Sequence, residues 1–400
     1  MISVSEAEQI ILAHRKDYGV ERVPFLTAQG RVLAENVAAD RDLPPYDRVT
    51  MDGIAIRFAD YEAGCRHYPI AATQGAGDAP LTHLAANACL EIMTGAAIST
   101  PADTVIPYEN LRIADGVAQV VAESVRWRQN IHFQGTDRRK GNTVMAAGQV
   151  IGPAQINMAA AMGKSELWVK KLPRVAILSS GDELVDVTDT PLPYQIRRSN
   201  NYSTCAELRH YGIEAAMLHL PDDPDIIRQK VAHCQTEFDV LLLSGGVSMG
   251  KFDYIPAALE ATGVLMHFHK VRQRPGKPFW FGTFGKRGVV FALPGNPVST
   301  FFCLHRYVLP WLDASLGFPP AAPQYAVLGK NVRFEPPMLY FIQVKLRQDP
   351  DARLWAEPLE GHGSGDFANL LDTDAFLELP PERTEFGAGE VFRVVRFGRG

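Results

Sequence analysis

The stretch 238-FDVLLLSGGVSMGKFDYIPAALEAT-262 decides the fold of this chain. Its apolar run from Val240 to Leu243 lies between turn residues and predicts a buried strand of a parallel sheet. Gly245 and Gly246 then allow a tight turn, and Asp253 is the predicted N-cap of a helix. A strand, a glycine turn and a helix N-terminus together present backbone N–H groups to an anion.

The same stretch contains most of a nucleotide-binding motif. Residues 245–251 spell G-x-x-x-x-G-K, the pattern of a P-loop. The next residue is Phe252, where a P-loop has a Ser or Thr hydroxyl for magnesium, so a P-loop nucleotidase is not expected. Asp253 offers a carboxylate to a phosphate or its magnesium ion. Taken alone, a simple capping role is the better explanation of Asp253.

Composition places the chain among ordinary globular proteins. Its 400 residues are too many for one compact core, and 46% are hydrophobic and 21% charged. A net charge of −5 gives no general reason to expect nucleic acid binding. Five cysteines without a CxxC pair indicate neither a disulfide framework nor a zinc site. Without a signal peptide or an 18-residue apolar run, we expect a cytoplasmic protein that does not enter a membrane.

Alternating strand and helix patterns predict a doubly wound α/β domain between residues 174 and 315. Helices are predicted at Ser5–Tyr18, with Ser5 as N-cap and Glu8 completing a capping box, and at Thr27–Val37 and Pro153–Met162. Short strands between turns predict two small β domains, the second of them barrel-like. The predicted division is an N-terminal helical domain of residues 1–40 and 146–172, a β domain of 41–145, an α/β domain of 173–318 and a C-terminal β domain of 319–400.

Polar residues follow the strand ends of the α/β region. Ligands of doubly wound folds bind beyond the carboxyl ends of the strands, so these residues are expected to meet at one site. Seven residues meet this description: Glu183, Asp222, Gly245, Gly246, Asp253, Gly295 and Asn296.

A basic stretch follows in HKVRQRPGKP, residues 269–278. Its four cations suit phosphate recognition, and the aromatic residues at 279–281 argue against a merely solvated loop. His267 and His269 would point the same way on a strand. Metal binding by these two histidines is not favoured, because the sequence offers no third ligand near them.

Several motifs resemble those of the MoeA/gephyrin E-domain family, the molybdopterin molybdenumtransferases. In the α/β region they are GDEL at 181–184, SGGVSMGKFDY at 244–254, PGKP at 275–278 and LPGNPVS at 293–299. MDG at 51–53, TGA at 94–96 and the Gly135-Thr136-Asp137 loop match the second domain of that family. The resemblance covers essentially the whole chain in order.

This resemblance implies an enzyme of molybdenum cofactor biosynthesis. The family inserts molybdate into adenylylated molybdopterin and releases AMP in a step that depends on Mg²⁺. The resemblance also implies a homodimer of four-domain subunits, with the active cleft between the α/β domain of one subunit and the β domain of the other. The implied partners are the upstream adenylyltransferase and apo-molybdoenzymes, with no nucleic acid and no membrane.

Carried over by position, the resemblance also implies site residues. Asp222 and Asp253 would steer magnesium, while Lys270, Arg274 and Lys277 would balance the charge of the substrate and molybdate. Substrate would be bound on the α/β side by Glu183, Ser244, Gly245, Gly246, Ser248, Pro294, Gly295, Asn296 and Pro297, and on the partner side by Asp52, Thr94 and Asp137.

Three positions depart from the family pattern. Arg274 stands where the family has a lysine, Thr136 where it has a glutamate, and Arg198 where it has an aspartate. These changes leave open a changed oxyanion preference, such as tungstate, or a divergent molybdopterin-binding carrier or scaffold. An adenylyltransferase would need only the α/β domain, so the flanking regions count against that third function.

Overall fold

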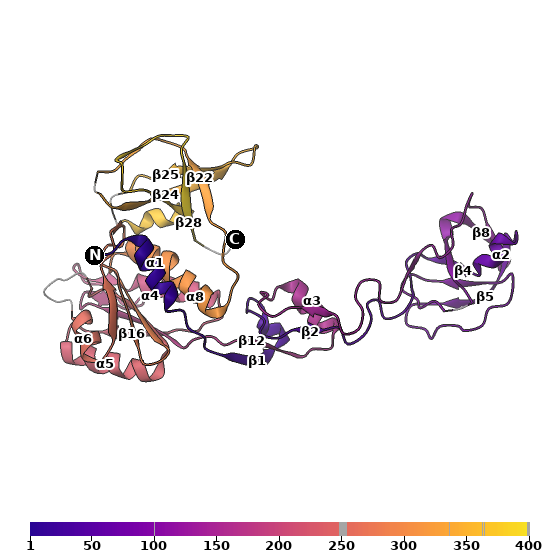
Figure 1. Ribbon diagram of the computed structural model, residues 1–400, viewed down its shortest axis with the longest axis horizontal. Helices are drawn as coiled ribbons and strands as arrows, with labels where there is room; N and C mark the ends of the chain where they lie inside the picture. Colours follow the sequence, from indigo (N-terminus) through magenta and orange to yellow (C-terminus); the bar gives the residue numbers. More distant parts are fainter. Residues whose placement is uncertain (100, 248–253, 336, 362, 364, 398–400) are drawn as a thin grey trace. The chain divides into compact units, whose positions relative to one another are not determined.

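The computed structural model describes residues 1–99, 101–247, 254–335, 337–361, 363 and 365–397, and Figure 1 shows its elements in chain order. The chain forms two compact units. None of the helices within the described ranges is both long and apolar enough to cross a membrane. The larger unit contains Met1–Glu35, Ala147–Ile156 and Glu166–Gly400, and the smaller unit contains Asn36–Ala146 and Asn157–Ser165.

The larger unit is built on a six-stranded sheet. Its first four strands are parallel, and the fifth is antiparallel to both of its neighbours. Three adjacent parallel strands are buried along their whole length, which explains their uninterrupted apolar runs in the sequence. In spatial order the strands are β16 (Ala216–Leu220), β13 (Val175–Ser180), β17 (Val240–Ser244), β21 (Gly288–Leu293), β20 (Trp280–Phe284) and β18 (Leu265–His269).

Helices cover both faces of this sheet (Figure 1). Alternate residues of β17 enter opposite core layers, Leu242 packing in the layer that contains Leu208 and Leu241 in the layer that contains Ile227. The predicted doubly wound α/β domain is therefore confirmed. One layer contains α1 (Val4–Ala13), α4 (Ser199–Arg209), α7 (Pro297–Cys303), the π-helical turn Leu304–Val308 and α8 (Leu309–Leu316), and the other contains α5 (Pro224–Glu237) and α6 (Ile255–Ala261).

Two predicted helix starts are wrong by one or two residues. The N-cap of α1 is Ser3, whose side chain forms the capping box with Glu6, because the S-x-x-E pattern occurs twice and this register buries Val4, Ala7 and Ile11. The N-cap of α6 is Tyr254, not Asp253, and the Tyr254 side chain makes no capping hydrogen bond. Asp253 itself lies outside the described residues.

The predicted helix over Thr27–Val37 is wrong. Only η1 (Phe25–Ala28) is helical, as a single 3₁₀ turn. Beyond it the chain is extended, and Val32 and Leu33 form bridges with Val150 and Val169. Tertiary pairing thus overrides the local pattern. Nearby elements are β1 (Val20–Pro24), which pairs with β12 (Glu166–Lys170), and α3 (Pro153–Ala161), which was predicted to end one residue later.

The C-terminal region is a closed five-stranded barrel, as the barrel-like prediction expected. Pairing between its first and last strands closes the ring. In ring order the strands are β24 (Leu339–Gln348), β25 (Leu354–Pro358), β22 (Gln324–Leu328), β28 (Val391–Arg396) and β26 (Ala375–Leu379). Smaller elements of the larger unit are β14 (Leu184–Val185), β15 (Ile196–Arg197), β19 (Gln273–Arg274), β23 (Val332–Arg333), β27 (Glu385–Phe386) and η4 (Phe367–Leu371).

The smaller unit is mainly β-structure, as the spacing of its strands predicted. Its six-stranded sheet runs β7 (Thr104–Pro107), β4 (Gly53–Ile56), β6 (Cys89–Ile92), β5 (His67–Gln74), β9 (Val117–Val120) and β8 (Leu111–Ala114). Two further pairs join β3 (Arg48–Val49) to β10 (Ile131–His132) and β2 (Val37–Ala38) to β11 (Thr143–Met145). Short helical turns are α2 (Phe58–Glu62) and η2 (Tyr108–Asn110).

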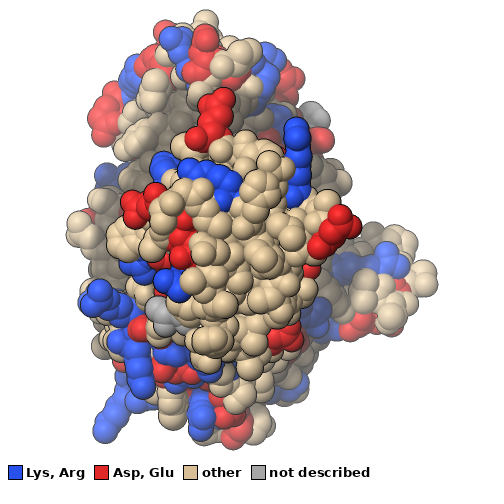
Figure 2. All heavy atoms as spheres, turned by 90° about the vertical axis from the view of Figure 1, so that its right-hand side faces the viewer, with Lys and Arg blue, Asp and Glu red and all other residues tan. Residues whose placement is uncertain are grey.

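The surface carries charges of both signs. On the face drawn in Figure 2, Lys and Arg side chains are interspersed with Asp and Glu around a broad uncharged area. This mixture agrees with the small net charge of −5.

Candidate functional site

A pocket of about 570 Å³ opens where β13, β17 and β21 end at their carboxyl edge. We call it the strand-end pocket. Parallel strands bring their following loops together at this edge, so residues far apart in the sequence meet there. Eight of the residues expected in the site line it: Glu183, Gly245, Gly246, Arg274, Lys277, Pro294, Gly295 and Asn296.

Two glycine turns form one wall of the strand-end pocket. Gly245 has a φ of +96°, and a Cβ atom there would lie 2.9 Å from the carbonyl oxygen of Ser180. A Cβ on Gly295 would lie 3.5 Å from the Cα of Gly245, so the two turns lie against each other. Backbone atoms therefore form this wall, and a side chain at 245 would strain the turn and displace Ser180.

Asn200 connects these two glycine turns. It lies two residues after Arg198, the residue that stands where the family has an aspartate. Its side-chain amide donates to Ser244 Oγ and to the carbonyl oxygen of Gly295, each at 2.9 Å, and lies 3.2 Å from Thr300 Oγ1. One side chain from α4 thus joins the end of β17, the Gly295 turn and α7. Sequence reasoning did not name Asn200 as a site residue, because none of these contacts is local.

The acidic residues after β16 have separate roles. Asp223 caps α5 by accepting hydrogen bonds from the backbone N–H groups of Asp225 and Ile226, at 2.9 Å each. Asp222 instead accepts a hydrogen bond from Ser180 Oγ at 3.2 Å, and Ser180 lines the strand-end pocket. Asp222 is therefore held beside the pocket, although it is not a lining residue.

Two expected site residues, Ser248 and Asp253, lie outside the described residues. Within the described ranges no group of three or more His, Cys, Asp or Glu side chains is arranged to hold a metal ion. His267 and His269 have protein partners, Thr283 Oγ1 and the carbonyl oxygen of Val247, each at 2.9 Å.

The cationic wall is the loop that contains Arg274 and Lys277. Gln273 anchors this loop, since it is fully buried and donates to the carbonyl oxygen of Gly276 at 3.1 Å. Tyr307 donates its hydroxyl to Gln273 Oε1. Arg274 and Lys277 extend from this anchored loop and are exposed. The other residues that line the pocket without having been named as site residues are Ser180, Val247, Gln273, Pro275, Gly276, Pro278, Ser299 and Met338.

Three other expected residues of the larger unit do not line the pocket. Lys270 has a φ of +74°, and its backbone N–H donates to Phe279 O at 2.9 Å. Pro297 is the first residue of α7. Ser244 ends β17 and accepts the hydrogen bond from Asn200. Arg198, the departure from the family aspartate, pairs with Asp186.

In the smaller unit, Asp52 and Thr94 are joined directly. The backbone N–H of Thr94 donates to Asp52 Oδ1 at 2.6 Å. This hydrogen bond, together with one from the Thr94 side chain, holds the pKa of Asp52 below its usual range. Asp52 is therefore ionised at neutral pH, and the MDG and TGA motifs form one exposed acidic site.

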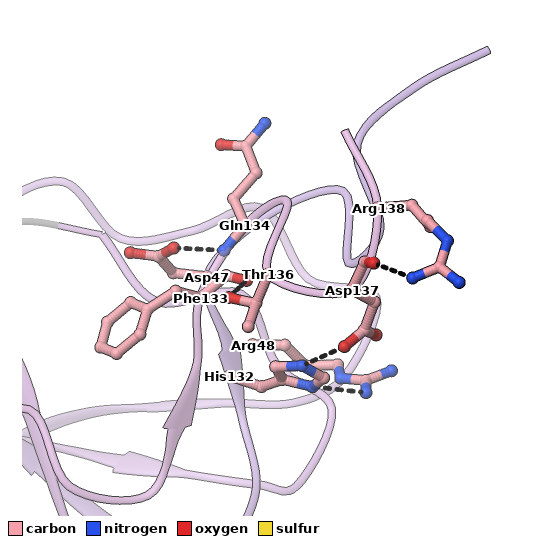
Figure 3. Close-up of polar contacts among 8 residues, drawn as sticks. All are labelled: Asp47, Arg48, His132, Phe133, Gln134, Thr136, Asp137 and Arg138. Atoms are coloured by element: carbon pink, nitrogen blue, oxygen red, sulfur yellow. Dashed lines mark hydrogen bonds and ion pairs between the residues drawn. The ribbon is translucent and has the colours of Figure 1, made fainter. Parts of the chain in front are cut away.

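Asp137 belongs to residues 130–141, which we call the Asp137 loop (Figure 3). Arg48 donates to His132 Nδ1 at 3.3 Å, and His132 Nε2 lies 3.0 Å from Asp137 Oδ1. Because a guanidinium only donates, Nδ1 accepts and the Nε2–H group donates to Asp137. The contacts thus hold one imidazole tautomer and orient the carboxylate. Thr136, the departure from the family glutamate, donates to Phe133 O at 2.7 Å and closes the turn.

Comparisons with known proteins identify the family. The family described as "MoeA N-terminal region (domain I and II)" matches residues 2–163, and "Probable molybdopterin binding domain" matches residues 176–314. "MoeA C-terminal region (domain IV)" matches residues 325–397. A molybdopterin molybdenumtransferase of Synechocystis sp. is 40% identical over 395 residues, which are 98% of this chain and 99% of that protein. The chain belongs to the MoeA family.

Further relatives agree with this assignment. A molybdopterin molybdenumtransferase of Synechococcus elongatus is 34% identical and covers 98% of this chain and 99% of its own length. A solved MoeA protein of Pyrococcus horikoshii is 27% identical, with a TM-score of 0.84 and full coverage of both chains. The prediction from the motifs is confirmed: the chain is a member of an enzyme family of molybdenum cofactor biosynthesis.

Proposed function

We propose that the chain inserts molybdate into adenylylated molybdopterin at the strand-end pocket and releases AMP in a magnesium-dependent reaction. One observation carries this proposal: a wall of glycine turns, an acidic side chain and a cationic loop meet around one pocket of about 570 Å³. Together these groups match the chemistry of an anionic pyrophosphate substrate.

The glycine wall suits the phosphate groups. Gly245 and Gly246 both have positive φ angles, and neither has a side chain to exclude a ligand from the backbone. The N–H of Gly245 donates to Leu293 O at 3.3 Å, so the N–H groups offered to phosphate oxygens would be those that follow it in the turn. Asn200 keeps this wall in place by bonding to Ser244 Oγ and to Gly295 O.

Asp222, held beside this wall, offers one carboxylate to a magnesium ion. Mg²⁺ prefers oxygen ligands and is usually held by one or two carboxylates together with substrate phosphates and water. Asp222 supplies a carboxylate whose orientation is fixed by Ser180 Oγ at 3.2 Å, and Asp253 is the second proposed ligand. When bound, the ion would polarise the pyrophosphate.

The cationic loop would balance the negative charge of the substrate. A water oxygen attacks one phosphorus of the pyrophosphate and the bridging P–O bond breaks. AMP leaves, molybdopterin keeps its phosphate, and the proton of the water passes to solvent. Arg274 and Lys277 lie at the pocket with Lys270 earlier on the same stretch, and they balance the charge of molybdate and of the breaking bond. Glu183 contributes a further carboxylate to the lining.

We also propose that the chain acts as a homodimer with the four-domain division given above. In this arrangement, Asp52, Thr94 and Asp137 of one copy would complete the pocket of the other. The support for this role is chemical, because the carboxylates of Asp52 and Asp137 are both exposed and oriented by hydrogen bonds.

Reconstitution tests the proposal. Purified protein is mixed with adenylylated molybdopterin, Mg²⁺ and molybdate, and AMP release is followed beside activation of an apo-molybdoenzyme. The expected result is AMP release that requires both molybdate and Mg²⁺, with activation. Binding without turnover in molybdate or tungstate would contradict the proposal and indicate a carrier or scaffold. Turnover with tungstate but not with molybdate would support the proposed reaction and change its oxyanion substrate from molybdate to tungstate.

A further inference from the structure

We propose that Phe334 is a positioning residue that fixes the guanidinium of Arg274 for bidentate binding of the molybdate oxyanion. The C-terminal barrel region would then set the affinity of the strand-end pocket for this substrate. This inference rests on the proposed function and deepens it, because it assigns the recognition of one substrate to one contact.

Arg274 is attached to the barrel by its backbone. It lies in β19, which pairs in parallel with β24 so that Arg274 is opposite Tyr340. The guanidinium carbon of Arg274 is 5.7 Å from the centre of the Phe334 ring. This distance lies within the range in which an aromatic face attracts a cation.

Phe334 is itself held in place. Its ring stacks on Tyr340, with the centroids 3.9 Å apart and an interplanar angle of 14°. Its backbone N–H donates to Thr384 O at 2.8 Å. The ring that faces Arg274 is therefore fixed from two sides, by a stacked neighbour and by a backbone hydrogen bond.

The same segment of the barrel region reaches the pocket. Met338 lines the strand-end pocket together with Arg274 and Lys277. The aromatic pair therefore lies next to the place where an oxyanion would meet the cationic wall. Within the strand-end pocket as the described residues form it, Met338 is the contribution of the barrel region to the lining.

Arginine needs such an anchor more than lysine does. A lysine ammonium is a compact charge that binds an oxyanion from many directions, whereas the planar guanidinium binds two oxygens only in one orientation. Arg274 is exposed, so without a neighbour its long side chain would take many rotamers. The Phe334 ring limits the rotamers of Arg274 and directs its guanidinium toward the pocket.

The first test is the Phe334→Leu variant, which removes the ring and keeps an apolar side chain. We expect the KM for molybdate to rise about two- to five-fold with kcat nearly unchanged. The matched control is Trp355→Leu, which removes a comparable contact of the same barrel, with Arg347 at 5.8 Å, away from the pocket. A merely structural role would lower Tm and kcat and leave the molybdate KM unchanged.

The second test combines Phe334→Leu with Arg274→Gln. Because no guanidinium remains to be positioned, the leucine should have no further effect on the molybdate KM in that background. Calorimetric titration with tungstate compares the same variants by binding, without turnover. Absence of AMP release by the wild type would therefore refute the proposed function and leave this inference to be decided by the titration. Unchanged oxyanion affinity in Phe334→Leu, or the same loss with and without Arg274, would overturn the inference.

Discussion

The strand-end pocket and the Asp137 loop both carry expected site residues, but they are held in different ways. In the pocket, backbone turns follow buried strands and lie against each other, since a Cβ on Gly295 would be 3.5 Å from the Cα of Gly245. In the loop, two side chains near the surface hold each other, since half-buried His132 and exposed Asp137 are 3.0 Å apart. Changes to the pocket should therefore have large effects, and changes to the loop small ones.

The largest effect is expected from Gly245→Ala. The new Cβ would lie 2.9 Å from Ser180 O at a φ of +96°, so the glycine wall has to move. We expect kcat/KM for AMP release to fall by about 100-fold or more, since displacement of a reacting group by about 1 Å has this effect. The matched control is Gly263→Ala, where φ is +80° and nothing lies within 4 Å of the new Cβ. If both variants lose activity equally, strain alone explains the loss.

The second prediction compares a buried ion pair with exposed ones. Arg306 donates to Glu8 Oε2 at 2.8 Å, and their side chains are 5% and 29% exposed. Glu8→Gln leaves the buried guanidinium without its charged partner, so unfolding free energy at pH 7 should fall by about 2 kcal/mol. Glu335→Gln, in a pair of 69% and 70% exposure, should change it by less than about 0.5 kcal/mol. Urea unfolding followed by tryptophan fluorescence measures both.

The Glu8 pair also predicts a pH dependence. The hydrogen bond from Arg306 lowers the pKa of Glu8, although burial opposes the shift. A lowered pKa in the folded state means that the stabilisation is complete above the pKa of unfolded glutamate, about 4.3, and is lost as pH falls through the folded value. The difference between wild type and Glu8→Gln should therefore shrink below about pH 4. A constant difference from pH 7 to pH 3 would contradict this account.

Asn200→Asp should have an intermediate effect. The carboxylate keeps the shape of the side chain but cannot donate to Ser244 Oγ or Gly295 O. We expect about a thirtyfold fall in kcat/KM, since the two lost hydrogen bonds are worth roughly 1 kcal/mol each. Ser203→Ala on the same helix removes a hydroxyl that donates to the carbonyl oxygen of Asn200 and should leave turnover unchanged. Full activity of Asn200→Asp would show that the two turns do not depend on this contact.

The smallest effect is expected in the loop. His132→Ala removes the donor that orients Asp137, but both side chains are accessible to solvent, by 29% and 56%. The KM for adenylylated molybdopterin should rise by no more than about fivefold, because exposed ion pairs contribute at most about 1 kcal/mol. His83→Ala, exposed in the same unit, is the control. A hundredfold loss from His132→Ala would mean that His132 itself contacts the substrate.

The sequence predicted this molecule best where local pattern and burial agree. The strand Val240 to Leu243 is continuous in apolar character because both of its faces are buried. The prediction of a helix at Thr27–Val37 was wrong because Val32 and Leu33 form bridges to distant residues. No local signal reports such pairing.

The sequence predicted only part of the pocket, because contacts between distant residues leave no local signal in it. Gly245, Gly246 and Gly295 with two further lining residues were named from strand ends, the two cations from the basic stretch, and Pro294 from the family resemblance. These eight residues line one pocket. Gln273, Asn200 and Phe334 were not named, because their roles depend on contacts with residues far away in the chain. Sequence pattern thus locates the residues that line this pocket better than the residues that hold them in place.

The most direct test of the central claim is a crystal structure of the protein soaked with adenylylated molybdopterin and tungstate, which marks the oxyanion by its strong scattering. The account predicts pyrophosphate density against the turns of Gly245 and Gly295, with tungstate beside Arg274 and Lys277. Ordered ligand bound at another place on the chain, with the strand-end pocket empty, would contradict it.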